Sequence, residues 1–482
     1  MMTSDAALLY SAYAAVVFAA AVGLVLGLGA LTALERKFDR YIVPTLIPLI
    51  VLGIAGGALL SGRRVEYAAL DLDLVGTGSG AGSWLSRIVS ALVVGLALAV
   101  LFGRLVRREH FKATRGQSLI WAYVLFFIGN NVLNAAFGTE PSFVHSSYYP
   151  LLVFAAVHAR RDEGVESFVL AVKYSLLVLA AGSLVAAVVL PSVAVQPGYN
   201  GWIPGLSIRL WGLGSNPNSV GPLALVLFLI EICYPSKFKW LGWLTLAIAL
   251  AVLVLAQSKT AWASLIVGAF VLVVHRLLVR NDGRLPMGWF VAASFGLAAV
   301  LLVVMSGVLD SRIDRFISSR AGGDATTLSG RNLVWQAAIG EWRNSPIVGY
   351  GPELWNAAYR SRIGLRFAVS AHNQFLQSLS GAGLVGLSSL LIYLVALGWQ
   401  SLKAAGTTRG LSVALFVLIV LRCITETPLV QTNLLVGDVV VHLLLFGLVA
   451  RSLTIGMRAS PASADSAHAM SHRHGMAIRQ VT

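Results

Sequence analysis

The sequence is poor in charged residues and almost free of cysteine. Asp, Glu, Lys and Arg make up 12% of its 482 residues, whereas 57% are hydrophobic and the mean hydropathy is +0.78. A soluble core of this length does not need so many apolar residues, so the composition excludes an ordinary soluble enzyme and predicts a polytopic membrane protein. The two cysteines, Cys233 and Cys423, fall in apolar stretches and indicate neither a disulfide framework nor a metal site.

The excess of basic residues does not indicate a nucleic-acid partner. The formal net charge is +15, but in a membrane protein lysine and arginine hold loops on the cytoplasmic side. Residues 453–482 are polar and rich in Ser, Ala and His from Ala459 onward, which predicts a disordered cytoplasmic tail. Its histidines are more simply interpreted as solvated than as metal ligands.

Hydrophobic runs of about 20 residues predict an all-α fold with about 13 transmembrane helices. The first run is too long for the core of a signal peptide, so we interpret it as an extra N-terminal span before twelve others. The runs cover residues 8–34, 41–61, 84–103, 117–137, 142–159, 166–190, 218–234, 240–256, 260–279, 287–307, 372–399, 409–426 and 433–451.

Basic residues in the loops predict the orientation of these spans. Loops with lysine and arginine alternate with loops that have few, and basic loops face the cytoplasm. The basic loops lie at residues 104–115, 160–161, 237–239, 276–284 and 403–409. We therefore expect N-terminal transmembrane helices in 1–309, a periplasmic helical loop at 310–371, C-terminal transmembrane helices in 372–452 and the tail at 453–482.

The predicted periplasmic loop 310–371 has eight arginines, five acidic residues and no lysine. Arginine outside the membrane runs against the charge rule, so another explanation is needed. The guanidinium group binds diphosphate in a bidentate manner, whereas lysine acts as a point charge. The loop therefore indicates an anionic, membrane-anchored substrate.

Three polar helix starts are expected on the same side as this loop, at residues 215–219, 257–260 and 370–373. The first helical turn exposes free N–H groups and the positive end of the helix dipole, which together favour an anion. With Arg209 and Lys259 nearby, the three starts would suit a diphosphate. The dipole should also keep His372 neutral, as a general base requires.

Each of these residues also has a simpler interpretation. His372 and Lys259 could extend to the membrane interface, and Arg209 could be an ordinary loop charge. Asn216 and Asn218 could be helix caps with no other role. The coincidence of all three helix starts on one face favours the functional interpretation.

Several motifs then follow one another in a fixed order. They are Gly330-Arg331-Asn332-Leu333-Val334-Trp335, residues 344–351, His372-Asn373-Gln374-Phe375-Leu376 and residues 381–386. This set resembles the conserved core of the O-antigen ligase/polymerase superfamily (the Wzy_C-type domain), which includes exopolysaccharide polymerases. With the earlier helix starts, the similar core spans about residues 205–395.

The resemblance implies a GT-C-like glycosyltransferase that needs no metal or cofactor and inverts the anomeric centre. It would act on the periplasmic face of a bacterial inner membrane, among membrane lipids. The enzyme would move a glycan from undecaprenyl diphosphate to a hydroxyl of a lipid- or carrier-linked glycan acceptor.

The resemblance also assigns roles to residues. His372 is similar to the family's catalytic histidine, and Arg209 to an arginine that contacts the diphosphate. Lys259 stands where many relatives carry a second arginine, so the bidentate fork is lost there. Arg331 matches a Gly-Arg pair and could bind the donor or brace the loop, with Glu341 as one candidate partner. Asn216, Asn218 and Asn373 would support the site.

Alternatives stay open. A ligase and a polymerase differ only in the acceptor. A metal-dependent transferase could use Asp71-Leu72-Asp73, although such spacing arises easily by chance. A transporter or flippase could use the intramembrane Lys173 and Glu231, but no internal repeat supports it.

Overall fold

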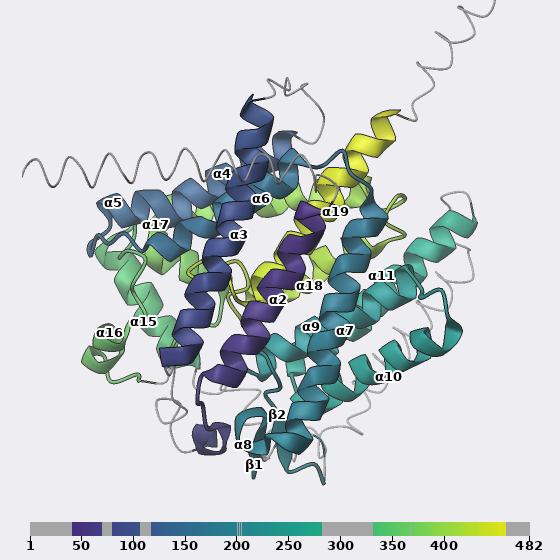
Figure 1. Cartoon of the computed structure of the whole chain (residues 1–482). Coiled ribbons are helices and arrows are strands. Elements are labelled where there is room, and N and C mark those ends of the chain that lie inside the picture. The colour runs from purple at the N-terminus through teal and green to yellow at the C-terminus, as the bar shows by residue number, and fades with distance from the viewer. Residues whose placement is uncertain are drawn as a thin grey trace, which may run out of the picture.

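In the computed structural model of the chain, the described residues are 41–69, 80–106, 117–199, 201, 203, 205–281, 331–366 and 368–458. Almost all of their regular elements are helices, arranged as a bundle (Figure 1). The longer helices are α2 (Ile42–Leu60), α3 (Gly80–Val106), α4 (Gln117–Phe127), α6 (Tyr149–Ala159), α7 (Val165–Val189), α9 (Pro217–Cys233), α10 (Lys239–Ala256), α11 (Lys259–Arg280), α15 (Arg331–Asn344), α17 (Gln374–Lys403), α18 (Leu411–Thr425) and α19 (Gly437–Arg458). The shorter elements are η1 (Val65–Ala69), η3 (Ile128–Val132), α5 (Leu133–Phe137), η4 (His145–Tyr148), α8 (Pro191–Ala194), β1 (Val195–Pro197), β2 (Ile208–Leu210) and α16 (Ala357–Arg362).

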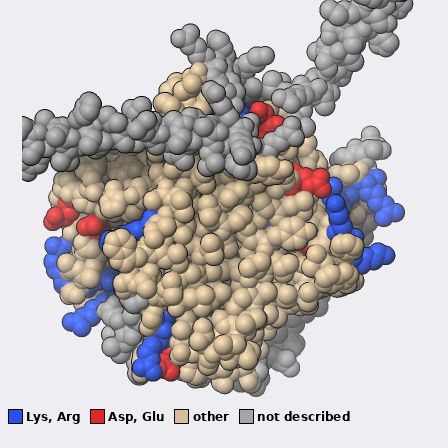
Figure 2. Space-filling model, in the orientation of Figure 1, with Lys and Arg blue, Asp and Glu red and all other residues tan. Residues whose placement is uncertain are grey.

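The protein is an all-α polytopic membrane protein, as its composition predicted. Eight helices of the described residues are long and apolar enough to cross a membrane, and α9 and α18 are shorter apolar helices. The face drawn in Figure 2 is largely uncharged across its middle, with most charged side chains near its edges. Two predicted spans, 8–34 and 287–307, lie outside the described residues, as do the tail from residue 459 and the loop residues 310–330.

Two of the predicted spans are not single regular α-helices in the structure. The run at 142–159 forms η4 and α6, and α6 has only 11 residues, about 16 Å of helix. Pro150 in its first turn and the basic pair Arg160-Arg161 after its end set these limits. The run at 117–137 is helical throughout but contains the π-helical turn η3. In addition, α19 continues to Arg458, beyond the predicted start of the tail.

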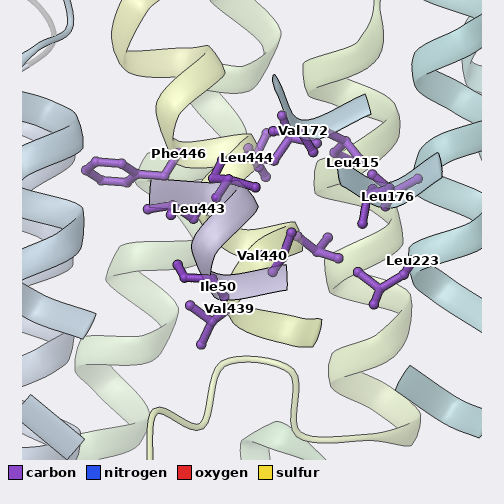
Figure 3. Packing of buried hydrophobic residues seen from close by; sticks show 14 of the residues in the cluster. Ile50, Val172, Leu176, Leu223, Leu415, Val439, Val440, Leu443, Leu444 and Phe446 are labelled. Carbon is purple, nitrogen blue, oxygen red and sulfur yellow. The ribbon is translucent and has the colours of Figure 1, made fainter. Parts of the chain in front are cut away.

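The core lies between the helices rather than on one face of each. α19 runs through the middle of the bundle (Figure 1), where Val440, Leu444 and Phe446 are fully buried. Figure 3 shows these side chains packed among residues of α2, α7, α9 and α18, including Ile50, Val172, Leu176, Leu223 and Leu415. A helix that is apolar on all sides is suited to such a central position.

Basic residues at the ends of the helices make two groups of contacts. Arg104 in the last turn of α3 pairs with Asp162 after α6 at 2.6 Å, and Arg451 of α19 lies 3.5 Å from Glu163. Arg276 near the end of α11 and Arg409 before α18 both donate to carbonyl groups at the end of α9. Arg104 is thereby joined to the loop after α6, and Arg276 and Arg409 are joined to the end of α9.

The described part of the predicted periplasmic loop folds onto the first half of α17. Its helices α15 and α16 enclose a small core of their own, which contains Val334, Leu354 and Tyr359. α17 is interrupted at Gly383, where φ is +63°. Segment 346–351 supplies the hydrogen-bond partners that the interrupted turn lacks. The amides of residues 350 and 351 donate to the carbonyls of residues 380 and 381, and the amides of residues 384 and 385 donate to the carbonyls of residues 346 and 347. Gly383 and, in the facing segment, Gly349 and Gly351 have positive φ values, which glycine adopts without strain.

Candidate functional site

Glu426, directly after α18, is the centre of a polar cluster. Its Oε2 atom lies 2.9 Å from Nδ1 of His372. Its Oε1 atom accepts from Nη2 of Arg331 at 3.2 Å and from Nδ2 of Asn218 at 2.9 Å. The carboxylate therefore connects the starts of α9 and α15 with the residue that precedes the α17 cap.

The charge of Glu426 is stabilised by its neighbours. Burial raises the pKa of this carboxyl, but the hydrogen bond and charge of His372 and the charges of Arg331 and Arg422 together lower it below its usual value. Glu426 is thus a carboxylate at neutral pH. When the imidazole of His372 is neutral, the contact of Nδ1 with this anion holds the ring proton on Nδ1 and leaves Nε2 as the nitrogen that can accept a proton from a substrate.

Arg209 joins the cluster through Asn218. It lies on β2, which pairs with β1 so that Arg209 is opposite Gln196. Its Nη2 donates to Oδ1 of Asn218 at 3.0 Å and its Nε donates to the carbonyl of Ala256 at 3.1 Å. Its guanidinium also lies 4.7 Å from the ring centroid of Tyr199. The position of Arg209 is therefore fixed by contacts with three different segments.

One backbone hydrogen bond is missing from the first turns of α9, and Arg422 replaces it at Asn218. Pro222 has no N–H, so the carbonyl of Asn218 lacks its helical donor. Nη2 of Arg422 donates to that carbonyl at 3.1 Å, and Arg422 also pairs with Asp438 at the start of α19. Arg422 thus holds the backbone of Asn218, and the side chain of Asn218 links Arg209 with Glu426.

The three predicted helix starts come together. Asn216 caps α9 by accepting from the amide of Ser219, and Asn373 caps α17 by accepting from the amide of Leu376. α11 begins with Lys259, and Thr260 Oγ1 lies 3.0 Å from Thr425 Oγ1, beside Glu426. Asn216 and Asn373 are therefore caps, whereas Asn218 has the different role described above.

The backbone of His372 is constrained. Its φ is +46°, a conformation that histidine adopts more often than most non-glycine residues. The preceding residue, Ala371, accepts a hydrogen bond from Nε1 of Trp335 at 3.0 Å and donates to Oε1 of Gln377 at 2.9 Å. α15 and α17 together thus fix the imidazole against Glu426.

A cavity of about 690 Å³ opens beside this cluster. Arg209, Asn216, Asn218 and His372 form a polar part of its wall, and small residues of α2 and α3 form another part. The latter are Gly53, Gly57, Ala58, Gly82, Ser83 and Ser86. The cavity therefore offers polar and cationic groups that suit an anion, together with small residues that leave room for an apolar chain.

Arg63 is a lining residue that the sequence did not single out. It is 5% exposed and donates to the carbonyls of Val193, Gly212 and Gly214. Burial lowers its pKa to about 10, so it is still a cation at neutral pH. Arg63 therefore fastens the segment before α9 to the end of α2.

Two of the residues predicted to bind the donor, Lys259 and Arg331, have contacts that the sequence did not predict. Lys259 is exposed, and no hydrogen bond or ion pair joins it to the cluster within the described residues. Arg331 pairs with Glu426 and not with Glu341, which instead accepts from the hydroxyl of Tyr359 at 3.1 Å. The suggestion of Glu341 as the partner of Arg331 is therefore not supported by the geometry.

The residues of the alternative hypotheses lie elsewhere. Lys173 and Glu231 form a fully buried ion pair at 2.7 Å, and Lys173 also donates to the carbonyl of Tyr234. Ser236 donates to Glu231 through both its amide and its hydroxyl. This pair is thus satisfied within the fold. Asp71 and Asp73 lie outside the described residues.

The comparisons with known proteins bear on the same region. Residues 244–391 match a protein family model described as O-antigen ligase. Over 183 residues the chain is 27% identical to the exopolysaccharide production protein ExoQ of Rhizobium meliloti (strain 1021). That match covers 35% of this chain and 40% of the relative, so the chain spans less than half of the length of this curated relative.

These findings confirm the resemblance to the O-antigen ligase/polymerase superfamily. The family match includes Lys259, Arg331 and His372, and lies within the predicted core at 205–395. Arg209 and Glu426 fall outside it and join the site only through the fold.

Proposed function

We propose that this protein is a membrane glycosyltransferase of the O-antigen ligase type. It moves a glycan from undecaprenyl diphosphate to an acceptor hydroxyl on the periplasmic face of the bacterial inner membrane. The reaction is metal-independent and inverts the anomeric centre.

The amphipathic cavity supports this donor. A lipid-linked glycan has a diphosphate between an apolar chain and a sugar. Arg209 and the helix starts in its wall would stabilise the diphosphate, both when it binds and when it leaves. The small residues of α2 and α3 would accommodate the first isoprene units. Arg331 would contribute charge while it holds Glu426.

His372 is the proposed general base. Nε2 removes the proton of the acceptor hydroxyl as its oxygen forms a bond to the anomeric carbon. The bond between that carbon and the diphosphate oxygen breaks, and the diphosphate takes the electron pair. Glu426 orients the imidazole through Nδ1 and stabilises the imidazolium that forms. The proton then passes to solvent or to the released diphosphate.

One observation carries this proposal: Arg209, Asn218 and His372 line a single cavity, and Glu426 connects Asn218 with His372 from behind them. This connected path supports the proposal because a cation suited to the leaving group and a base suited to the acceptor would belong to one hydrogen-bonded unit. A fixed arrangement of both groups supplies the proximity that a transfer reaction needs.

The test is transfer of a labelled, lipid-linked glycan by the purified protein in detergent, where no sealed compartment exists. We expect a labelled product of higher mass, with a second lipid-linked glycan or with the lipid A-core as acceptor. Failure to transfer in detergent, together with glycan movement across sealed vesicles, would favour a transporter instead.

A polymerase is the second candidate. The similarity to a relative described as an exopolysaccharide production protein favours it. A polymerase joins one carrier-linked repeat unit to another, so a deletion strain would lose polymer. A ligase mutant would instead keep the carrier-linked polymer and lack it on lipopolysaccharide. The two phenotypes separate the candidates.

A further inference from the structure

A second cavity borders the segments that carry His372 and Glu426. It has a volume of about 50 Å³, room for three or four water-sized groups. No charged side chain lines it. Six side-chain amides do, contributed by Asn130, Asn131, Asn134, Gln374, Gln377 and Gln431. We refer to it as the amide cavity.

Two of these amides connect the amide cavity with the proposed catalytic pair. Oε1 of Gln377 accepts from the amide of Ala371, next to His372, at 2.9 Å. Oε1 of Gln374 accepts from the amide of Leu429, three residues after Glu426, at 2.9 Å. The wall of the cavity is thus built from the same helix start and loop that hold the base.

Two residues that line the amide cavity each have a buried side-chain atom without a partner among the described residues. Asn134 is 3% exposed and donates through Nδ2 to the carbonyl of Gly381, but its Oδ1 atom has no donor. Gln431 is 1% exposed and accepts from the hydroxyl of Tyr123, but its Nε2 atom has no acceptor. A buried polar group without a partner destabilises the fold, so a ligand that satisfies it gains binding free energy.

The unpartnered atoms define what the cavity can bind. One is an acceptor and the other is a donor, and a hydroxyl group can satisfy both kinds at once. The absence of charged lining residues does not favour a phosphate or a carboxylate. An uncharged ligand that can insert one or two hydroxyl groups into a small cavity fits these requirements. The ring hydroxyls of a sugar are such groups.

We propose that the amide cavity binds hydroxyl groups of the acceptor glycan and so orients the attacking sugar toward His372. This inference rests on the proposed function, because it assigns the second substrate of the same reaction. The donor and the acceptor would then approach the base from two separate cavities. Asn134 and Gln431 would contribute to acceptor specificity.

The experiment measures transfer to free oligosaccharides at a saturating concentration of lipid-linked donor. The oligosaccharides are released from the repeat unit and from the lipopolysaccharide core. They lack a diphosphate leaving group and can act only as acceptors. For Asn134→Leu and Gln431→Met we expect the acceptor KM to rise roughly two- to tenfold each, as for one lost hydrogen bond. The donor KM and kcat should stay unchanged.

Gln400→Met is the matched control. Gln400 is also a buried glutamine with one unpartnered atom, but it lies at the other end of α17 and donates to Ser118. Its acceptor KM should equal that of the wild type. A third variant, Ser147→Val, narrows the amide cavity from η4 and should raise the acceptor KM without removing an amide.

The outcomes separate this inference from the proposed function. No transfer by the wild-type protein to any acceptor would contradict the proposed function and the inference with it. Normal wild-type transfer with an unchanged acceptor KM in the folded variants would overturn the acceptor site alone. An equal rise in KM in Gln400→Met would also overturn it, because the effect would then be a general one on packing.

Discussion

Nδ1 of His372 lies 2.9 Å from Oε2 of Glu426, which brings the residue before the α17 cap into contact with the residue after α18. This contact determines which imidazole nitrogen is free. It also ties the proposed base to Arg331 and Asn218, which share the other carboxylate oxygen. Glu426 is therefore proposed as the positioning residue of the site.

Replacing Glu426 with glutamine keeps the size of the side chain and removes its charge. The amide can present its NH₂ group to Nδ1, which would leave the imidazole proton on Nε2. We expect kcat to fall roughly tenfold or more, because part of the contribution of the base is lost. The donor KM should stay near its wild-type value in the transfer assay. A rise in donor KM with an unchanged kcat would assign Glu426 to donor binding instead.

The same carboxylate makes the stability of the fold depend on pH. Its pKa in the folded protein lies below the usual 4.5, so its stabilising contribution is complete above about pH 4.5 and is lost as the pH falls through the folded value. Thermal unfolding between pH 6 and pH 3.5 should therefore show a steeper loss of Tm in the wild type than in Glu426→Gln. Parallel curves would show that Glu426 gains no net stabilisation from its partners.

The small residues of α2 are proposed to admit the isoprenoid chain. A side chain at Gly57 would project beside Ser86 on the cavity wall, whereas a side chain at Gly95 of α3 would meet open space. Gly57→Leu should weaken the binding of glycan-free undecaprenyl diphosphate by roughly 1–3 kcal/mol, about 5- to 150-fold, by overfilling the cavity. Binding to the Gly95→Leu control should be unchanged. Equal affinities in both variants would place the lipid elsewhere.

The buried pair Lys173–Glu231 tests the transport alternative. Lys173→Met should destabilise the protein by roughly 3–5 kcal/mol because Glu231 keeps its charge without a partner. The double variant Lys173→Met, Glu231→Gln should recover most of the loss in a thermal unfolding measurement. Its rate of glycan transfer per folded molecule should match the wild type. A stable double variant without transfer would give this pair a functional role.

Much of the fold could be predicted from the sequence because membrane helices are apolar over a fixed length. The run at 142–159 was long enough by composition, but Pro150 and the preceding 3₁₀ turn limit α6 to 11 residues. The interruption of α17 at Gly383 was also not predicted, since it depends on backbone partners in segment 346–351.

The candidate site could be predicted in part. Helix-start signals located Asn216, Asn373 and His372, because capping is a local interaction. Glu426 was missed, although a lone acid at the end of an apolar span is a signal that could have been followed. Arg331 was expected to pair with nearby Glu341, but the fold supplies Glu426, 95 residues away. The partner of a long side chain depends on tertiary contacts, which sequence distance does not reveal.

The most direct measurement compares glycan transfer by purified wild-type protein with transfer by His372→Ala, after both are shown to be inserted and folded. If His372 is the base, kcat should fall by roughly a hundredfold or more, and binding of undecaprenyl diphosphate should persist. Transfer by the folded variant at the wild-type rate would contradict the central claim.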